Sequence, residues 1–131
     1  MRNRLAVAVL LAAVACGQAA SDPLQPAYQP QVTNVTDSFA LQLTGVQNGS
    51  ASLAYTWRNT GTAATVDRSC AISGGTVTLV IRDAAGTQVY AGPLAGQTGS
   101  VGTASGVTGD WTIRVDFADA TGTINFRVQK G

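Results

Sequence analysis

The chain has 131 residues, of which 11% are charged, and eight Lys and Arg residues against seven Asp residues give a formal net charge of +1. This balance lacks the basic surface that nucleic-acid binding requires. The chain has no His and no Glu, and its one Lys is Lys130, which excludes histidine acid/base catalysis, histidine-ligated metals and glutamate pairs. We therefore expect a protein without enzymatic activity and without a cofactor.

The first residues have the pattern of an export signal. Arg2 and Arg4 precede an uninterrupted apolar run from Leu5 to Ala15, which is 11 residues long. A helix needs about 20 apolar residues to cross a bilayer, so this run predicts a removable signal peptide at residues 1–15 rather than a membrane span. The mature protein is then expected outside the cytoplasm.

The signal ends in the residues AVAC at positions 13–16, where small residues directly precede a cysteine. This motif resembles the lipobox of bacterial lipoproteins, although Leu is usual at the position of Ala13. The resemblance implies that diacylglycerol is joined to the thiol of Cys16, and two or three acyl chains make a stable membrane anchor. Because Gly17 and not Asp follows Cys16, the resemblance also implies an outer-membrane or cell-surface location in a bacterium with two membranes.

Residues 16–31 are expected to form the lipidated Cys16 and an extended tether. Residues 17–31 contain three of the four prolines and show neither helical nor strand periodicity. Proline-rich chains favour an extended geometry of about 3.1 Å per residue, so this segment would hold the domain up to roughly 45 Å from the membrane. Cleavage by ordinary signal peptidase after Ala19 or Ala20 is the alternative to lipidation.

From residue 32 onward, apolar and polar residues alternate in several stretches. Alternation of Val, Ile, Leu and aromatic residues with polar ones is typical of strands that are buried on one face. Turn signals containing Gly, Asn or Asp separate these stretches. The alternating stretches are 39–43, 53–57, 77–81, 111–117 and 124–128, and the turn signals are 45–49, 59–61, 73–75, 83–86 and 119–122.

This pattern predicts one all-β domain over residues 32–131, an antiparallel sandwich of about seven strands. The glycine-rich stretch 91–109 is expected to be an edge strand with long loops. Residues 76–90 and 109–128 resemble the strand, D-x-x-G turn, strand and G-x-W-x-I/V-x-V pattern of small immunoglobulin-like or prepeptidase-C-terminal-type sandwiches found on exported bacterial proteins. The resemblance implies a fold and no particular activity, because such folds carry many functions.

Two kinds of residue are candidates for sites. Asp110, Asp116 and Asp119 could approach one another near a hairpin turn, and carboxylate oxygens suit Ca²⁺, although no D-x-D-x-D loop is present. Cys70 is an even number of positions from the apolar residues Val66 and Ile72, so in a strand it would face the same side, which predicts a core thiol. A reactive or intermolecular cysteine is the alternative.

The eight aromatic residues bear on carbohydrate binding. Six of them occupy the alternating strand positions that are predicted to face inward, and they are expected in the core: Phe39, Tyr55, Trp57, Trp111, Phe117 and Phe126. The other two, Tyr28 and Tyr90, remain as exposed surfaces on which a sugar could stack.

The leading functional hypothesis is a non-catalytic, lipid-anchored protein of the cell envelope. Its partners would be the membrane, through the acyl chains on Cys16, and other envelope proteins or further copies of itself, because uncharged strands can pair edge to edge. The alternative is a carbohydrate- or calcium-binding module, and an enzyme is the third, disfavoured class. Hydrolysis would require a base beside a Ser or Thr nucleophile, and the composition offers neither a His nor a suitably placed Lys.

Overall fold

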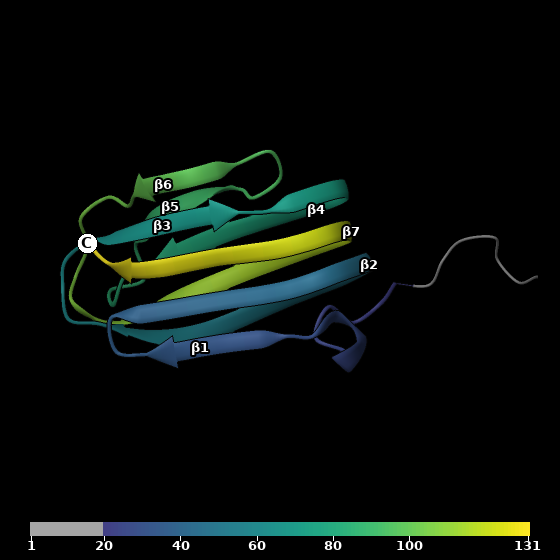
Figure 1. The fold of residues 1–131 in the computed structure, drawn as a ribbon. Coiled ribbons are helices and arrows are strands. Elements are labelled where there is room, and N and C mark those ends of the chain that lie inside the picture. The colour runs from purple at the N-terminus through teal and green to yellow at the C-terminus, as the bar shows by residue number, and fades with distance from the viewer. Residues whose placement is uncertain (1–19) are drawn as a thin grey trace, which may run out of the picture.

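The computed structural model describes residues 20–131, which form an all-β fold with a single turn of 3₁₀ helix. All strand pairings are antiparallel, and the seven strands belong to one sheet (Figure 1). The predicted antiparallel sandwich of about seven strands is confirmed. The elements are η1 (Pro26–Tyr28), β1 (Gln31–Val35), β2 (Ser38–Asn59), β3 (Ala64–Ser69), β4 (Ala71–Arg82), β5 (Gln88–Pro93), β6 (Thr98–Gly102) and β7 (Gly109–Lys130).

The sandwich arises because long strands bend and take part in both layers. β2 pairs with β7 over their whole lengths, from Ser38 opposite Gln129 to Asn59 opposite Gly109, with register shifts in the middle. β3 and β4 follow one another along the other side of β7. One layer holds β1, the first half of β2, the second half of β7, β3 and β6, and the other holds the remaining halves of β2 and β7 with β4 and β5 (Figure 1). We call these the front layer and the back layer.

The bends lie together at one end of the molecule, which we call the corner end and define by residues 45–49, 73–75 and 119–122. Three of the predicted turns fall here and are wrong as turns, because the strands continue through them with irregular register. Backbones approach closely at this point: a Cβ on Gly75 would lie 2.2 Å from the Asp119 carbonyl oxygen, and one on Gly122 would lie 2.1 Å from the Ala71 carbonyl oxygen. Glycine is therefore needed for the bend and not for a chain reversal.

Four of the connecting loops gather at the opposite end, which we call the loop end. It comprises residues 36–37, 60–63, 83–87 and 103–108 together with the C-terminus. Here the predicted turn at 83–86 is confirmed as the connection between β4 and β5, and the one at 59–61 falls at the end of β2. Residues 91–109 contain the short edge strand β6 between loops, as expected.

The core lies between the two layers and follows the predicted alternation. Five of the six aromatic residues expected inside are buried, and Tyr55 is half-buried with its ring 5.1 Å from that of Phe39. Trp57 and Trp111 meet edge to face at 6.0 Å, a favoured aromatic geometry. The other buried apolar residues come mainly from the inward positions of β2, β4 and β7.

Part of the predicted tether is packed against the sandwich, which corrects the expectation of an extended segment over 16–31. The Ser21 amide donates to the Asn48 carbonyl at 2.9 Å, and the Ser50 amide donates to the Ser21 carbonyl at 3.1 Å. η1 then places Tyr28 with only 8% of its surface exposed and its hydroxyl 3.2 Å from the Gln47 carbonyl. Burial of an aromatic ring against the corner end outweighs the extended preference of the prolines. The predicted signal peptide and Cys16 lie outside the described residues.

Candidate functional site

The three Asp residues proposed as calcium ligands lie on β7 but do not converge. Asp110 and Asp119 are nine positions apart, about 30 Å along an extended strand. Within residues 20–131, no group of three Asp, Cys, His or Glu side chains could hold a metal ion. Each carboxylate is engaged by neighbouring side chains: Asp110 by Arg58 at 3.5 Å, Asp116 by Ser52 and by Arg114 at 3.0 Å, and Asp119 by Ser50 at 3.4 Å.

Cys70 connects β3 to β4 and packs against the core, although it is only half-buried. Its Sγ lies 3.4 Å from the Asn125 carbonyl oxygen, to which the thiol donates, and the Asn125 amide donates back at 3.5 Å. Burial raises the pKa of the thiol, which leaves little thiolate at neutral pH. The position fits a structural thiol better than a nucleophile.

Neither of the two tyrosines expected at the surface offers a free ring. Tyr28 is buried at the corner end, and Tyr90 is half-buried against the core. The prediction of exposed stacking platforms was wrong for both. Tyr28 follows a Pro–Ala pair in η1, a local signal for a folded turn that the proline count concealed.

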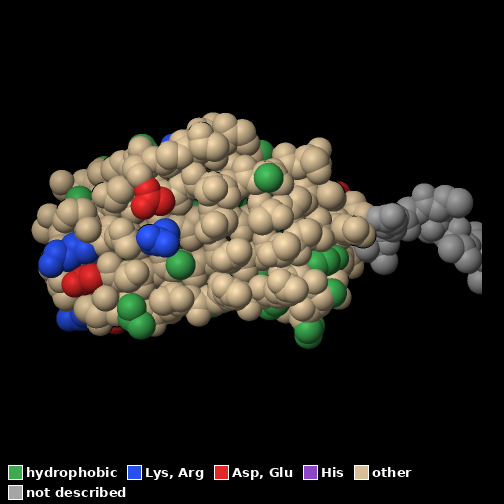
Figure 2. All heavy atoms as spheres, viewed as in Figure 1, with side chains coloured by type: hydrophobic (Ala, Val, Ile, Leu, Met, Phe, Trp, Pro, Cys, Tyr) green, Lys and Arg blue, Asp and Glu red, His purple; other side chains and the backbone are tan. Residues whose placement is uncertain are grey.

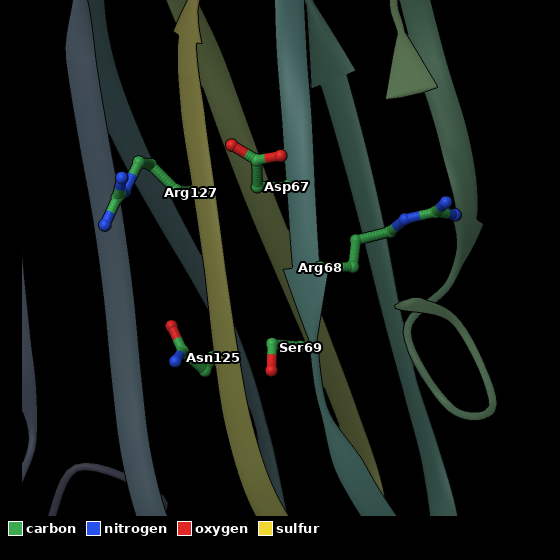
Figure 3. A pocket seen from close by; sticks show the side chains of 5 residues that line it. All are labelled: Asp67, Arg68, Ser69, Asn125 and Arg127. Carbon is green, nitrogen blue, oxygen red and sulfur yellow. The ribbon is translucent and has the colours of Figure 1, made fainter. Parts of the chain in front are cut away.

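A shallow hollow of about 220 Å³ opens on the outer surface of the front layer, between β3 and β7. Five polar residues line it: Asp67, Arg68, Ser69, Asn125 and Arg127 (Figure 3). They come from adjacent strands, with Asp67 directly opposite Arg127 in the register. Sequence analysis did not single out these residues, because outward polar positions on a strand look alike until the partner strand is known.

Two side chains of this hollow have internal partners. Arg68 donates to the carbonyl oxygens of Gly99 at 3.3 Å and Thr98 at 3.4 Å, and also to the Gln97 side chain, so its guanidinium is held against the start of β6. The Asp67 carboxylate accepts a hydrogen bond from the Ser100 hydroxyl.

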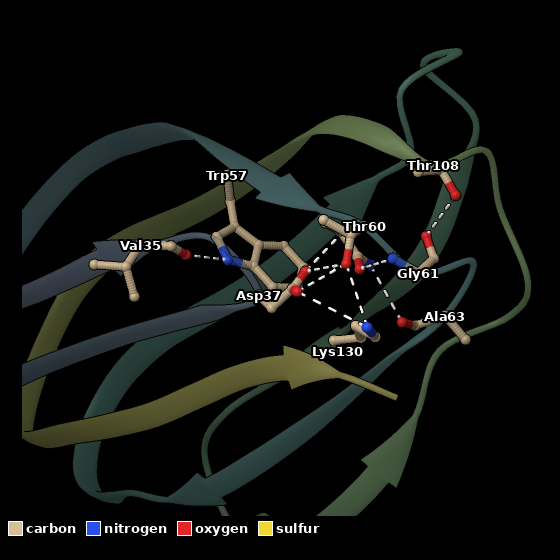
Figure 4. A network of polar contacts seen from close by, with 9 residues as sticks. Val35, Asp37, Trp57, Thr60, Gly61, Ala63, Thr108 and Lys130 are labelled. Carbon is tan, nitrogen blue, oxygen red and sulfur yellow. Dashed lines mark hydrogen bonds and ion pairs between the residues drawn. The ribbon is translucent and has the colours of Figure 1, made fainter.

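The loop end carries a second polar cluster, which is centred on Asp37, Asn59 and Thr60. Figure 4 shows Asp37 and Thr60 of this cluster beside Lys130. The Asp37 carboxylate accepts hydrogen bonds from the Thr60 amide at 2.8 Å and from the Thr60 hydroxyl at 2.7 Å, and these bonds lower the pKa of Asp37. The buried Asn59 accepts from the Gly61 amide at 2.8 Å and donates to the Ala63 carbonyl at 3.2 Å. Because these groups bond to one another and to the loops, the cluster shapes the loop end rather than offering a ligand site.

Asp83 plays the same part in the loop after β4. Its carboxylate accepts from the Val107 and Thr87 amides, both at 2.8 Å, and from the Ala85 amide at 3.0 Å. The bond from Val107 is the main cause of a lowered pKa for Asp83. One side chain thus ties the β4–β5 turn to the β6–β7 loop.

Charged side chains are unevenly distributed over the molecule. In the view of Figure 2, blue and red side chains gather toward the loop end, and the half nearer the corner end is polar and apolar without a visible cation. The residues that form the corner end, together with 21–30, include Asp22 and Asp119 but no Lys or Arg. Electrostatic attraction to an anionic surface is therefore not a property of that end.

Comparison with protein-family models gives no match, and no curated protein matches the chain. Within residues 20–131, no helix has the length and apolar character of a membrane span.

Proposed function

We propose that this protein is a non-catalytic, lipid-anchored component of the cell envelope that presents its β-sandwich for contact with other proteins. The sequence supports the anchor through the signal-like residues 1–15 and the small residues before Cys16. The structure adds one supporting observation: hydrogen bonds from Ser21 and Tyr28 hold residues 21–28 against the corner end.

That fastening limits the distance between the domain and its anchor. Ser21 is the fifth residue after Cys16, and five fully extended residues reach about 17 Å at most. A lipid on Cys16 would therefore hold the corner end close to the bilayer, and the 45 Å separation expected from the proline-rich sequence is too long. The corner end has no cation for anionic lipid headgroups, so membrane attachment depends on the acyl chains.

The same geometry leaves the loop end and the two outer sheet faces for partners. Hydroxyl, amide and charged side chains occupy these faces, a composition that suits reversible contacts more than permanent ones. The charged loop end lies at the opposite end of the strands from residues 21–28, which pack against the corner end.

Metabolic labelling with a fatty acid tests the anchor. We expect label on the wild-type protein, no label on Cys16→Ser, and full label on the matched control Cys70→Ser. An unlabelled wild-type protein, or equal labelling of Cys16→Ser, would contradict lipidation.

Crosslinking in intact cells, followed by purification of the tagged protein, tests the contact function. We expect a reproducible protein partner whose crosslinks map to the loop end or to an outer sheet face. Recovery of the protein alone would count against a role in protein contacts, whatever the result of the labelling experiment.

A further inference from the structure

The second half of β2 forms an edge of the back layer, because it pairs with β7 on one side only. Hydrogen bonds at both ends of this edge show which backbone groups point outward. Near the corner end, the Ser50 amide donates to the Ser21 carbonyl at 3.1 Å. Toward the loop end, the Thr56 carbonyl accepts from the Asn34 side chain at 2.9 Å. Ser50 and Thr56 are an even number of positions apart, so the outward direction repeats at every second residue between them.

The residues between these two ends have outward backbone groups without a partner. By the same alternation, the amides and carbonyls of Ser52 and Ala54 point away from β7. Within residues 20–131, no neighbouring strand or loop bonds to them on that side. We call residues 50–56 of β2 the open edge. It presents two donors and two acceptors in a row, between the positions that Ser21 and Asn34 occupy.

Apolar side chains beside the open edge are incompletely covered. Leu53 and Tyr55 alternate with the buried Trp57 and share its inward direction, yet both are half-buried. Val32 lies on β1, at the same side of the sandwich (Figure 1). It stands opposite the buried Leu41 and therefore also points inward, but 44% of its surface is exposed. An apolar strip thus accompanies the unoccupied backbone groups.

The other strand edges have features that discourage the addition of a strand. β5 ends in Pro93, and its register with β4 is irregular. β1 and β6 have only five residues each, and Arg68 donates to two carbonyl groups of β6. Proline, charge, irregular register and short length all protect sheet edges. The open edge belongs to a strand of 22 residues, and positions 50–56 contain neither proline nor a charged side chain.

The two ends of the open edge limit what can be added to it. A second copy that paired through the same edge would contribute its own β2, which is continuous from Ser38 to Asn59. Antiparallel pairing at residues 52–54 would bring that strand to the place beside Gly49 that Ser21 already occupies. A short segment avoids this collision, because residues 50–56 span roughly 20 Å and leave room for about five extended residues.

We propose that the open edge binds a short, uncharged, extended segment of another protein by strand addition. Residues of the segment opposite Ser52 and Ala54 exchange backbone hydrogen bonds with them and direct their own side chains to solvent. The alternate residues face Leu53, Tyr55 and Val32 and are therefore apolar. This inference rests on the proposed role in protein contacts, and it specifies the form of the partner.

Hydrogen exchange of the purified protein, measured by nuclear magnetic resonance, tests the open edge itself. We expect the amides of Ser52 and Ala54 to exchange much faster than those of Leu53 and Tyr55, which face β7. Equal protection of all four amides would refute the open edge.

Titration with blocked pentapeptides tests binding; the probes are acetyl-TVTVT-amide, acetyl-TLTLT-amide and acetyl-TFTFT-amide. We expect saturable shifts of the Ser52 and Ala54 amides with at least one peptide. N-methylation of its threonine amides, which face β2, should weaken binding by about tenfold. N-methylation of its two apolar residues, which face away from β2, is the matched control and should have little effect. Absence of saturable shifts with every peptide, or equal weakening by both modifications, would overturn the proposal.

Variants of the protein test the same contacts from the other side. Ala54→Pro removes an outward amide and leaves the pairing with β7 intact, so it should weaken peptide binding by about tenfold. Ala54→Val keeps the amide and should bind like the wild type. Val32→Asp and Val35→Asp give a second comparison that does not depend on the folding of a proline variant. Only Val32 belongs to the apolar strip, and Val35, which is 56% exposed, has the opposite direction on β1. Equal binding by both aspartate variants would contradict the role of the strip.

A photo-crosslinking residue at position 54 of the full chain separates this inference from the proposed function. In intact cells, we expect crosslinks to an uncharged segment of a partner in which polar and apolar residues alternate. Crosslinks from the loop end but none from position 54 would overturn strand addition and leave the contact function standing. Crosslinks between two copies at position 54 would show that the occupant is a second copy, against the proposal.

Discussion

The chain changes direction in different ways at the two ends of this sandwich. At the corner end three strands bend without being interrupted, and glycines make room where backbones nearly touch. At the loop end the strands stop, and Asp37, Asn59 and Asp83 hold the loops through hydrogen bonds to backbone amides. One end therefore depends on the absence of side chains, and the other depends on particular polar side chains.

This difference determines what each end tolerates. The bend at the corner end depends on close backbone contacts, which leave no space for a methyl group at Gly75 or Gly122. The loops at the loop end are held by the carboxylates of Asp37 and Asp83, and these hydrogen bonds are weakened when the carboxylates are protonated. The following predictions separate the two cases, from the largest expected effect to the smallest.

The strongest test of the corner end is Gly75→Ala. Gly75 has a φ of 68°, and an added Cβ would lie 2.2 Å from the Asp119 carbonyl oxygen, so we expect the free energy of unfolding to fall by about 3 kcal/mol or more. Gly45→Ala is the matched control, because its φ is 64° with nothing within 4 Å, and should cost about 1 kcal/mol. Urea unfolding followed by tryptophan fluorescence measures both; equal losses would show that the close approach is not the cause.

At the loop end, Asn59→Ala should lower the free energy of unfolding by about 1 to 3 kcal/mol. The substitution leaves the Gly61 amide and the Ala63 carbonyl without their partner beside a fully buried position. Asn34→Ala is the control, since Asn34 is exposed and makes one bond, to the Thr56 carbonyl at 2.9 Å. The same urea titration measures both variants, and a loss for Asn34→Ala as large as that for Asn59→Ala would refute the assignment.

Acid should weaken the loop end. The folded-state pKa values of Asp83 and Asp37 are lowered, so their stabilisation is complete above the unfolded-state value of about 4 and is lost as the pH falls through the folded-state values. Urea midpoints recorded from about pH 7 down to pH 2 should therefore decline at the acid end. Asp83→Asn should flatten this decline. A decline of the same steepness in Asp83→Asn would contradict the role of Asp83.

The smallest effect is expected for Tyr28→Phe. Loss of the hydroxyl removes its bonds to the Gln47 carbonyl and to Ser21 while the ring stays buried, which should cost about 0.5 to 1.5 kcal/mol. Limited proteolysis should then cleave residues 21–30 faster than in the wild type, whereas the rest of the domain keeps its resistance. Unchanged cleavage would mean that the ring alone holds the segment.

The sequence was sufficient to predict the fold class and the inward faces of the strands, because alternation reports burial directly at residues such as Leu41, Leu79 and Val115. It was not sufficient to distinguish a bend from a turn. Gly74–Gly75 and Asp119 through Gly122 have the composition of turns, and only the pairing of β4 with β7 shows that the strands continue.

The candidate site was hidden from sequence analysis for a related reason. Asp67 and Arg127 are 60 positions apart, and only the register brings them opposite each other. The three Asp residues of β7, by contrast, are close in sequence but are distributed along the strand and point to different partners.

The position of β7 has a consequence for the time at which the molecule folds. β7 is the last strand in the chain, yet it pairs with β2, β3 and β4 and runs through the middle of both layers. A nascent chain that ends before residue 109 therefore lacks the neighbour that these three strands share, and contacts between distant residues form late and slowly. All seven strands must therefore leave the ribosome before the core can close.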